Sequence, residues 1–376
     1  MLKQMPLYLF LCLAFQLSAQ ENVDSIARLN LLFVGDIMGH RPQISSAQVI
    51  KDKKFNYEPV FQFVQPLIEK ADLAIANLEV TLPGEPPYQG YPNFRSPDDL
   101  ANALRLAGFD VLVTANNHSN DAKGQGVIHT IDVLEQNGFY QTGTFKNKLD
   151  RDLFYPLIVY KNGFKLAFLN YTYDTNNMKT VPPTMVNEIK ESLIKKDMEV
   201  ARRLNPDFII VMMHWGKEYQ LEENKRQQQL SKMIFEAGAD LIIGSHPHVI
   251  QPIKESTVMQ ADSSEKKVLV TYSLGNFISN QKKLNTDGGL VFEIELCKNL
   301  DSNTTYLGAY HYWPVWRYIH RANGKTTYHV LPIAAFENNT HPELKLPAKD
   351  LAAMKKFAKE MGAHLEMRNL KLEMEN

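Results

Sequence analysis

The sequence predicts a protein of the α/β class, and three observations support this prediction. Six short apolar runs rich in β-branched residues are bounded by turn-forming residues, which is typical of buried strands. Segments with apolar residues at helical spacing lie between them, and strands that alternate with helices indicate an α/β architecture. The 376 residues are 44% hydrophobic, which is enough material for one large core or two smaller ones.

The expected strands share one pattern, an apolar run that ends in polar or turn-forming residues. They are LNLLFVGD (29–36), DLAIANLE (72–79), DVLVTANN (110–117), DFIIVMMHWG (207–216), DLIIGSHPH (240–248) and KVLVTYSLGN (267–276). The expected helices cover residues 58–71, 96–108, 187–204 and 225–239. Pro66 is expected to break or kink the first of these helices, and Ser96 to cap the second.

The C-terminal part of the sequence predicts further strands and a final helix. Residues 288–296 alternate as a strand does, and a hairpin is expected around the turn at Asn323-Gly324. The segment 348–362 is an amphipathic helix that either caps the domain, which is the commoner case, or docks on a partner.

The first residues have the shape of a signal peptide. One Lys precedes an apolar run from Leu7 to Leu17, and small residues follow at Ser18 and Ala19. The run is shorter than the roughly 20 residues that span a bilayer. We therefore expect cleavage after about residue 20 and export to the periplasm or beyond, with membrane contact only if the signal stays uncleaved. The alternatives are a buried N-terminal helix and a lipoprotein.

Charge and cysteine content exclude several functions. The formal net charge is −1, so no basic field indicates a nucleic-acid partner. Removal of residues 1–20 leaves Cys297 as the only cysteine, which rules out an intramolecular disulfide and argues against a metal site built from thiolates. A metal would be held by nitrogen and oxygen ligands.

Five of the six strand ends carry Asp, Glu or His. Ligands in α/β sheets bind outside the carboxyl ends of the strands, so these side chains are expected to meet in one cleft. A single Asp or Asn in such a place is more often a turn former, but the recurrence favours a site. The expected cluster comprises Asp36, Glu79, Asn117, His118, His214, His246 and His248.

This set of residues suits a pair of divalent cations. Two imidazoles on either side of Pro247 can face one site or straddle two adjacent metals. Two cations about 3.5–4 Å apart stabilise both oxygens of an in-line displacement at phosphorus. A mixed nitrogen and oxygen set without sulfur suits Zn, Mn or Fe.

Several motifs together resemble the bacterial poly-γ-glutamate capsule synthesis (CapA) family, which is similar to the calcineurin-like metallophosphoesterases. The motifs are GDIMGHRPQ, ANLEVTL, FRSPDDLANALRLAGFDVLVTANNHSND, MMHWGKEY, IIGSHPHVIQP and YSLGNFI, within residues 30–295. The resemblance implies a metallophosphatase-like four-layer α/β/β/α sandwich with a dinuclear metal centre. We assign this domain to residues 28–335 and a C-terminal helical extension to residues 336–376.

The resemblance also implies a role for each strand-end residue. Asp36 and His248 would bind the first metal, and Glu79 would bridge the two. The second metal would be bound by Asn117, His214 and His246, and His118 would protonate the leaving group.

The sequence departs from the phosphoesterase pattern at two positions. Met38 stands where the pattern has a histidine, and His40 could supply the missing imidazole. Glu79 stands in place of the bridging aspartate and is one methylene longer. Both departures leave room for a protein without catalytic activity or for a different reaction.

Other residues near the motifs are candidates for substrate binding. Arg41 and Arg95 could bind phosphate or carboxylate, with a surface or ion-paired role as the alternative. Glu218 could orient His214, and Asn276 could line the cleft. The Pro- and Tyr-rich segment 83–94 is expected to form a loop over the rim.

The leading functional hypothesis is an exported metal-dependent hydrolase that acts on a phosphoester or on a cell-envelope polymer. The alternative is a non-catalytic accessory protein that binds an anionic polymer such as poly-γ-glutamate during capsule assembly or export. Both hypotheses imply an anionic substrate or ligand. The hypothesis of an accessory protein also implies the capsule-synthesis machinery as a partner.

Overall fold

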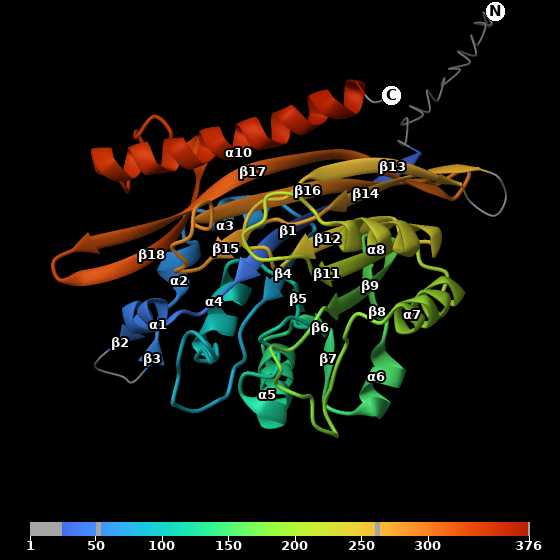
Figure 1. The fold of residues 1–376 in the computed structure, drawn as a ribbon, viewed down its shortest axis with the longest axis horizontal. Coiled ribbons are helices and arrows are strands. Elements are labelled where there is room, and N and C mark those ends of the chain that lie inside the picture. The colour runs from blue at the N-terminus through green and yellow to red at the C-terminus, as the bar shows by residue number, and fades with distance from the viewer. Residues whose placement is uncertain (1–24, 50–53, 260–263, 375–376) are drawn as a thin grey trace, which may run out of the picture.

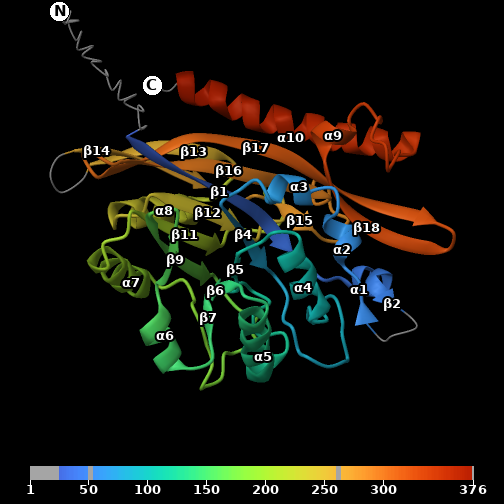
Figure 2. The ribbon, with the colours of Figure 1, turned by 180° about the vertical axis from the view of Figure 1, so that it is seen from behind.

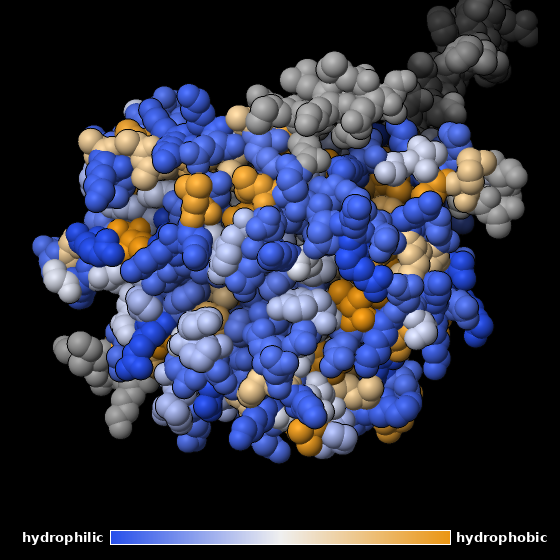
Figure 3. Space-filling model, viewed as in Figure 1, coloured by the Kyte–Doolittle hydropathy of each residue, from blue (hydrophilic) through white to orange (hydrophobic). Residues whose placement is uncertain are grey.

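The computed structural model describes residues 25–49, 54–259 and 264–374. The predicted signal peptide at residues 1–20 lies outside the described residues. Among the helices of the described part, none combines the length and the apolar character that crossing a bilayer requires. The face of the molecule seen in Figure 3 is mostly hydrophilic, with hydrophobic side chains scattered over it.

The first of two large sheets holds eight strands in the order β18-β17-β16-β1-β4-β5-β6, with β15 paired to the end of β1. Strands β1, β4, β5 and β6 run parallel to one another, and β16, β17 and β18 are antiparallel. The bounds are β1 Ile26–Ile37, β4 Leu73–Leu78, β5 Val111–Val113, β6 Tyr140–Thr142, β15 Asn276–Ile278, β16 Gly288–Asn299, β17 Thr304–Ala322 and β18 Lys325–Pro332.

The second large sheet holds six strands in the order β13-β14-β12-β11-β9-β8. Its four central strands are parallel, and β13 and β8 are antiparallel edge strands. The bounds are β8 Leu157–Lys161, β9 Phe164–Thr172, β11 Phe208–His214, β12 Leu241–Ser245, β13 Ile253–Met259 and β14 Glu265–Thr271. Two short pairs complete the strands, β2 Gln48–Val49 with β3 Lys54–Phe55 and β7 Thr144–Phe145 with β10 Met185–Val186.

The helices cover the outer faces of the two sheets. On the outer face of the first sheet, an apolar core includes residues of α2, α3 and α4, and on that of the second sheet the core includes α7 and α8. Figures 1 and 2 show these two groups at opposite sides of the molecule. The bounds are α1 Arg41–Ala47, α2 Glu58–Phe61, α3 Gln65–Ile68, α4 Asp99–Leu106, α5 Lys123–Gln136, α6 Lys148–Phe154, α7 Glu191–Arg203 and α8 Lys225–Glu236.

The inner faces of the two sheets share the largest apolar core. Alternate residues of each strand point inward, so Phe33, Phe168 and Phe292 meet there with no exposed surface. Two packed sheets between two helical layers confirm the predicted four-layer α/β/β/α sandwich.

Two details of the predicted helices are resolved by the structure. The segment 58–71 forms two short helices, and Pro66 lies in the first turn of the second. The prediction that Ser96 caps the next helix is wrong, because α4 begins at Asp99. The backbone N–H of Ser96 donates to the carbonyl of Thr81, which holds this residue in an extended segment before the helix.

The C-terminal region packs onto the same core. The hairpin between β17 and β18 turns at Asn323 and Gly324, both with positive φ, as the sequence predicts. Helix α9 (Ile333–Phe336) is followed by α10 (Ala348–Met374), which is longer than the expected 348–362. Met354 and Phe357 of α10 are buried in the inter-sheet core, and α10 runs along β17 in Figure 1. This helix therefore caps the domain, while the domain boundary at residue 335 stays a prediction.

Candidate metal centre

The end of β1 places Asp36 at the centre of the site. Gly35 lies so close to β15 that an added Cβ would stand 1.9 Å from the carbonyl oxygen of Gly275. The N–H of Asp36 donates to that same carbonyl at 3.0 Å. Only glycine allows this approach of two backbones, which fixes the position of the fully buried Asp36 carboxylate.

The loop after β12 brings two histidines to the same place. His246 and His248 both have positive φ, 96° and 59°, which is a strained conformation for residues other than glycine. The backbone N–H of His246 lies 3.3 Å from Oδ2 of Asp36, and the carbonyl of Pro247 accepts from the N–H of Tyr219 at 2.9 Å. The first contact ties the loop of the second sheet to Asp36 of the first sheet, and the second contact ties it to the segment that follows β11.

Two groups of potential ligand atoms form where the sheets meet. Within each group, one nitrogen or oxygen atom of every residue lies within 4.8 Å of the others, and Glu79 belongs to both groups. All members are buried. The groups are Asp36, Glu79 and His214, and Glu79, His246 and His248.

The buried polar atoms of these residues fit a cation. Among the described residues, neither carboxylate oxygen of Glu79 has a hydrogen-bond partner, and Nδ1 of His246 has none either. Oε1 of Glu79 lies 3.6 Å from Nε2 of His214 and 3.8 Å from Nε2 of His248, beyond hydrogen-bond distance. Buried polar groups in proteins are almost always paired, and an unpaired carboxylate is especially costly. Imidazole nitrogens and carboxylate oxygens are ligands for Zn, Mn or Fe, so the donor set accounts for the missing partners.

The electrostatics of the site also favour a bound cation. Burial lowers the pKa of His214 and of His246, and the neighbouring histidines lower the pKa of each further. Both rings are therefore neutral, which is the form that binds a metal. Burial raises the pKa of Glu79, and the nearby carboxylate of Asp36 raises it further. A cation between these carboxylates would offset that repulsion.

Asn276 orients His248. Nδ1 of His248 lies 3.0 Å from Oδ2 of Asp36 and 3.1 Å from Oδ1 of Asn276. The amide of Asn276 donates in turn to Gln281 and to the carbonyl of Thr286, each at 2.8 Å. Because these bonds employ the whole buried side chain, Asn276 supports a histidine at this position, and the contact with substrate that the sequence suggested stays a prediction.

His214 is held by residues other than the one that the sequence suggested. Its Nε2 lies 2.6 Å from Oδ1 of Asn117, and its Nδ1 lies 2.9 Å from Oγ of Ser245. Asn77 also reaches this ring, at 3.3 Å, and donates to Asp36 at 2.8 Å. The orienting role proposed for Glu218 thus belongs to Ser245, and neither Ser245 nor Asn77 stood out in the sequence.

His118 forms a buried pair with Asp121. Its Nδ1 lies 2.7 Å from Oδ2 of Asp121, and its ring packs edge-on against Phe94 at 4.5 Å between centroids. Burial raises the pKa of Asp121, while His118 and the N–H of Phe94 act in the opposite direction. Nε2 of His118 has a single weak contact, 3.5 Å from Asn176. Asp121 fixes the ring and leaves Nε2 available for proton transfer.

Met38 and His40, where the sequence departs from the phosphoesterase pattern, belong to neither of the two ligand groups. Met38 is buried in the outer core against the helices. His40 belongs to neither group, and its Nδ1 lies 3.1 Å both from Oε1 of Gln43 and from the N–H of Asn280. Burial lowers the pKa of His40 to about 4. At this position His40 supports the rim, and its role as a ligand stays a prediction.

The two arginines differ in their surroundings. Arg41 is exposed at the start of α1, and the segment 83–94 packs there, because a Cβ on Gly90 would meet the backbone of Arg41 at 2.4 Å. Arg95 is half-buried, and its Nε has no hydrogen-bond partner. Its charge acts on Asp121, which places it beside the His118 pair.

Comparison with known proteins identifies a family that this chain matches. The family model described as bacterial capsule synthesis protein PGA_cap matches residues 30–281. A capsule biosynthesis protein CapA of Bacillus anthracis is 27% identical over 289 residues, which cover 72% of this chain and 65% of that protein. A PGA biosynthesis protein CapA of Bacillus subtilis (strain 168) is 26% identical over 307 residues, which cover 78% of this chain and 76% of that protein.

Solved structures are similar only at low identity. The NAD nucleotidase NadN of Haemophilus influenzae has a TM-score of 0.48 and 11% identity, over 89% of this chain and 56% of that one. The calcineurin-like phosphoesterase YfkN of Bacillus subtilis has a TM-score of 0.42 and 14% identity, over 89% and 98%.

Proposed function

Because the chain belongs to the bacterial capsule synthesis protein PGA_cap family, we propose that it is an exported, metal-dependent hydrolase. Its substrate would be a phosphoester or a polymer of the cell envelope or capsule. The observation that carries this proposal is the pair of buried ligand groups that share Glu79, whose oxygens have no hydrogen-bond partner among the described residues.

The residues that would hold two divalent cations are those of the two groups, with Asn117 beside His214. Such cations, when bound, would activate water and stabilise negative charge on the scissile group. Glu79 lies in both groups and would bridge the cations. Asn276 and Ser245 hold the rings of His248 and His214 in place, which keeps the ligand geometry rigid.

His118 would protonate the leaving group. The contact with Asp121 keeps one ring nitrogen occupied and directs the exchangeable proton to the other, as a general acid requires. Arg95, half-buried beside this pair with an unpartnered Nε, would bind an anionic group of the substrate. Arg41 and Glu218, at the start of α1 and after β11, would contact more distant parts of the substrate.

One observation favours the accessory function as a second candidate. Met38 packs into the outer core and His40 joins neither ligand group, so the first metal position has fewer imidazoles than the phosphoesterase pattern provides. A weakly held cation could then serve to bind an anionic polymer without cleaving it.

The experiment that separates the two functions measures metal content and turnover together. The purified chain without residues 1–20 is analysed for bound metal and assayed on bis-p-nitrophenyl phosphate and on poly-γ-glutamate with added Mn²⁺. Hydrolysis that His118→Ala lowers by about 10²-fold or more, with metal content unchanged, is the expected result.

A second histidine provides the matched control. His129 also pairs with an aspartate, Asp98, at 2.8 Å, but it is partly exposed on α5 and belongs to no ligand group. His129→Ala should leave turnover unchanged. Metal-loaded protein without turnover on either compound, but with retained binding of poly-γ-glutamate, would favour the accessory function.

A further inference from the structure

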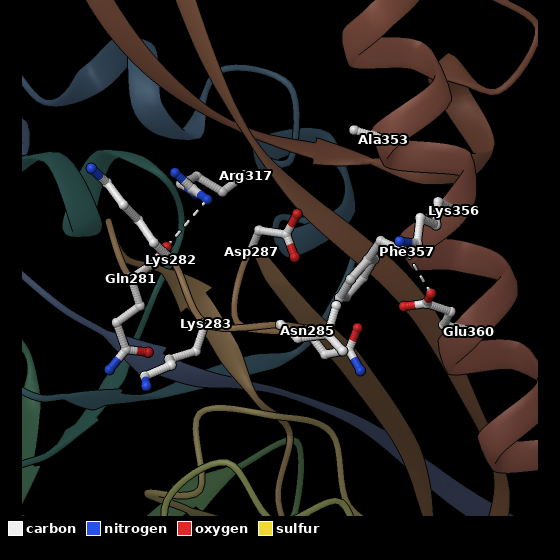
Figure 4. Close-up of a pocket in the computed structure, with 11 residues that line it drawn as sticks. Gln281, Lys282, Lys283, Asn285, Asp287, Arg317, Ala353, Lys356, Phe357 and Glu360 are labelled. Carbon is white, nitrogen blue, oxygen red and sulfur yellow. Dashed lines mark hydrogen bonds and ion pairs between the residues drawn. The ribbon is translucent and has the colours of Figure 1, made fainter.

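A basic cavity lies next to the metal centre, between the loop that follows β15 and helix α10. Its volume is about 260 Å³. Four of its lining side chains are cationic, and two are acidic, Asp287 and Glu360. Figure 4 shows the loop residues on one side and the α10 residues on the other. The cations of this basic cavity are Lys282, Lys283, Arg317 and Lys356.

The charges of the basic cavity are not balanced by the chain. Among the described residues, no carboxylate oxygen lies within 4.0 Å of Lys282, Lys283 or Arg317. Asp287 accepts a hydrogen bond from the indole of Trp316 at 2.8 Å, and Glu360 lies 3.7 Å from Lys356. The cavity therefore keeps an excess of positive charge.

The guanidinium of Arg317 is the second feature of the cavity that suits an anion. Within the described part of the chain, its buried Nε has no hydrogen-bond partner, and its Nη2 donates to the carbonyl of Gln281 at a long 3.5 Å. Burial lowers the pKa of Arg317, while Asp287 raises it. A guanidinium has five N–H donors in a fork that fits carboxylate or phosphate, so an anion in the cavity would supply the missing partner.

The basic cavity shares a wall with the metal centre. Gln281 lines the cavity, and its Oε1 accepts from the same Asn276 whose Oδ1 holds His248. The ammonium group of Lys283 lies 5.8 Å from the centroid of the Tyr219 ring, and that ring lies 6.3 Å from the ring of His248. A chain that extends from the metal centre along this wall would reach the lysines.

From these observations we propose that the basic cavity is an anion subsite, which holds a carboxylate or phosphate group of a polyanionic substrate one or more units away from the metal centre. The volume supports a subsite, because a pocket for a whole small molecule measures about 300–1,000 Å³. The proposal rests on the proposed function for the identity of the neighbouring site. The binding itself needs no turnover, so it can be tested separately.

The test measures binding of two polyanions to the chain without residues 1–20. The probes are a γ-linked oligoglutamate of defined length and inorganic tripolyphosphate, which separate a carboxylate from a phosphate preference. The variant Lys282→Gln/Lys283→Gln removes two exposed cations of the cavity, so that folding is not at risk. The control Lys355→Gln/Lys359→Gln removes two exposed cations of α10 that do not line the cavity.

The cavity variant should bind at least one probe about 3- to 10-fold more weakly than the control variant at low salt. The difference should shrink at high salt, because exposed charges are screened. Weakening for both probes indicates recognition of charge alone, and weakening for one names the group. Arg317→Gln, with an unchanged thermal unfolding curve, should weaken binding at least as much.

Equal binding by the cavity and control variants, for both probes, would overturn the subsite. Turnover of bis-p-nitrophenyl phosphate is measured in parallel in both variants, so that loss of the subsite is distinguished from loss of the hydrolase. If no variant hydrolyses anything but the cavity variant still binds more weakly, the proposed hydrolase fails and the subsite stands.

Discussion

Replacing Glu79 by Gln tests whether the site is built around cations. In the metal-free protein, Glu79 is a fully buried carboxyl beside the carboxylate of Asp36, and among the described residues neither of its oxygens lies within hydrogen-bond distance of a donor. Glutamine has nearly the same shape, carries no charge, and could donate its amide hydrogens to Asp36. The substitution should therefore stabilise the metal-free protein and abolish the stabilisation that metal confers.

The magnitude follows from the burial of the group. Moving an ionised carboxylate out of water costs several kcal/mol, and uptake of a proton relieves part of that cost. We expect Glu79→Gln to stabilise the metal-free protein by about 1–3 kcal/mol on this basis. Metal at 100 times its dissociation constant should stabilise the unsubstituted protein by about 2.7 kcal/mol, and the variant by much less.

Thermal unfolding after chelator treatment, with and without added Mn²⁺ or Zn²⁺, measures both effects. Because about 1 kcal/mol shifts the midpoint by roughly 2–4 °C in domains of 150–250 residues, shifts of a few degrees are expected in this longer chain. Glu218→Gln removes a partly exposed acid near the site and is the matched control. A Glu79→Gln variant that is less stable than the metal-free parent, and that still responds to metal, would refute the reasoning.

Four further substitutions test other parts of the structure. Asp121→Asn should lower kcat by about 10- to 100-fold with metal content unchanged, because His118 loses the charged acceptor beside its Nδ1; an unchanged pH–rate profile would count against this role. Gly35→Ala should destabilise the protein and weaken metal binding in titrations, because the new Cβ would clash with the carbonyl of Gly275. Gly362→Ala on α10 is the matched control: its Cβ would have no atom within 4 Å, so it should stabilise the protein by about 0.5–1 kcal/mol. Phe357→Ala should cost about 3–5 kcal/mol in denaturant unfolding if α10 is part of the core, and a cost near zero would mean that the helix docks only loosely.

The fold and the convergence of strand ends could be predicted from the sequence because both follow from local patterns. Each apolar run that ends in Asp, Glu or His became a strand of one of the two sheets, and the geometry of packed parallel strands brought Asp36, Glu79 and His246 together. Alternation of strands and helices determined the layers. None of this required knowledge of how distant side chains are oriented.

Side-chain orientation is where the sequence was insufficient. Glu218 follows His214 by four residues, but Gly216 between them has a positive φ of 92° and the chain turns there, so nearness in sequence did not produce a hydrogen bond between these two described residues. Ser245 supports His214 instead, because β11 and β12 pair in parallel with these two residues in register. Asp121 could have been noticed, since it follows His118 by three residues, whereas Asn77 is one of many polar residues near a strand end.

The energetic cost of the site bears on what it is for. Two histidines with positive φ cost about 1–3 kcal/mol each. Glu79 adds a buried carboxyl without a hydrogen-bond partner among the described residues, so without a bound cation the site lowers the stability of the folded protein. Bound cations would offset this cost in an enzyme and in a polymer-binding accessory protein alike.

The buried pair of His118 and Asp121 is different, because it belongs to neither ligand group. A protein that only binds an anionic polymer has no use for an oriented imidazole beside the ligands, whereas a hydrolase needs one to protonate its leaving group. This pair, more than the metal ligands, is what favours catalysis.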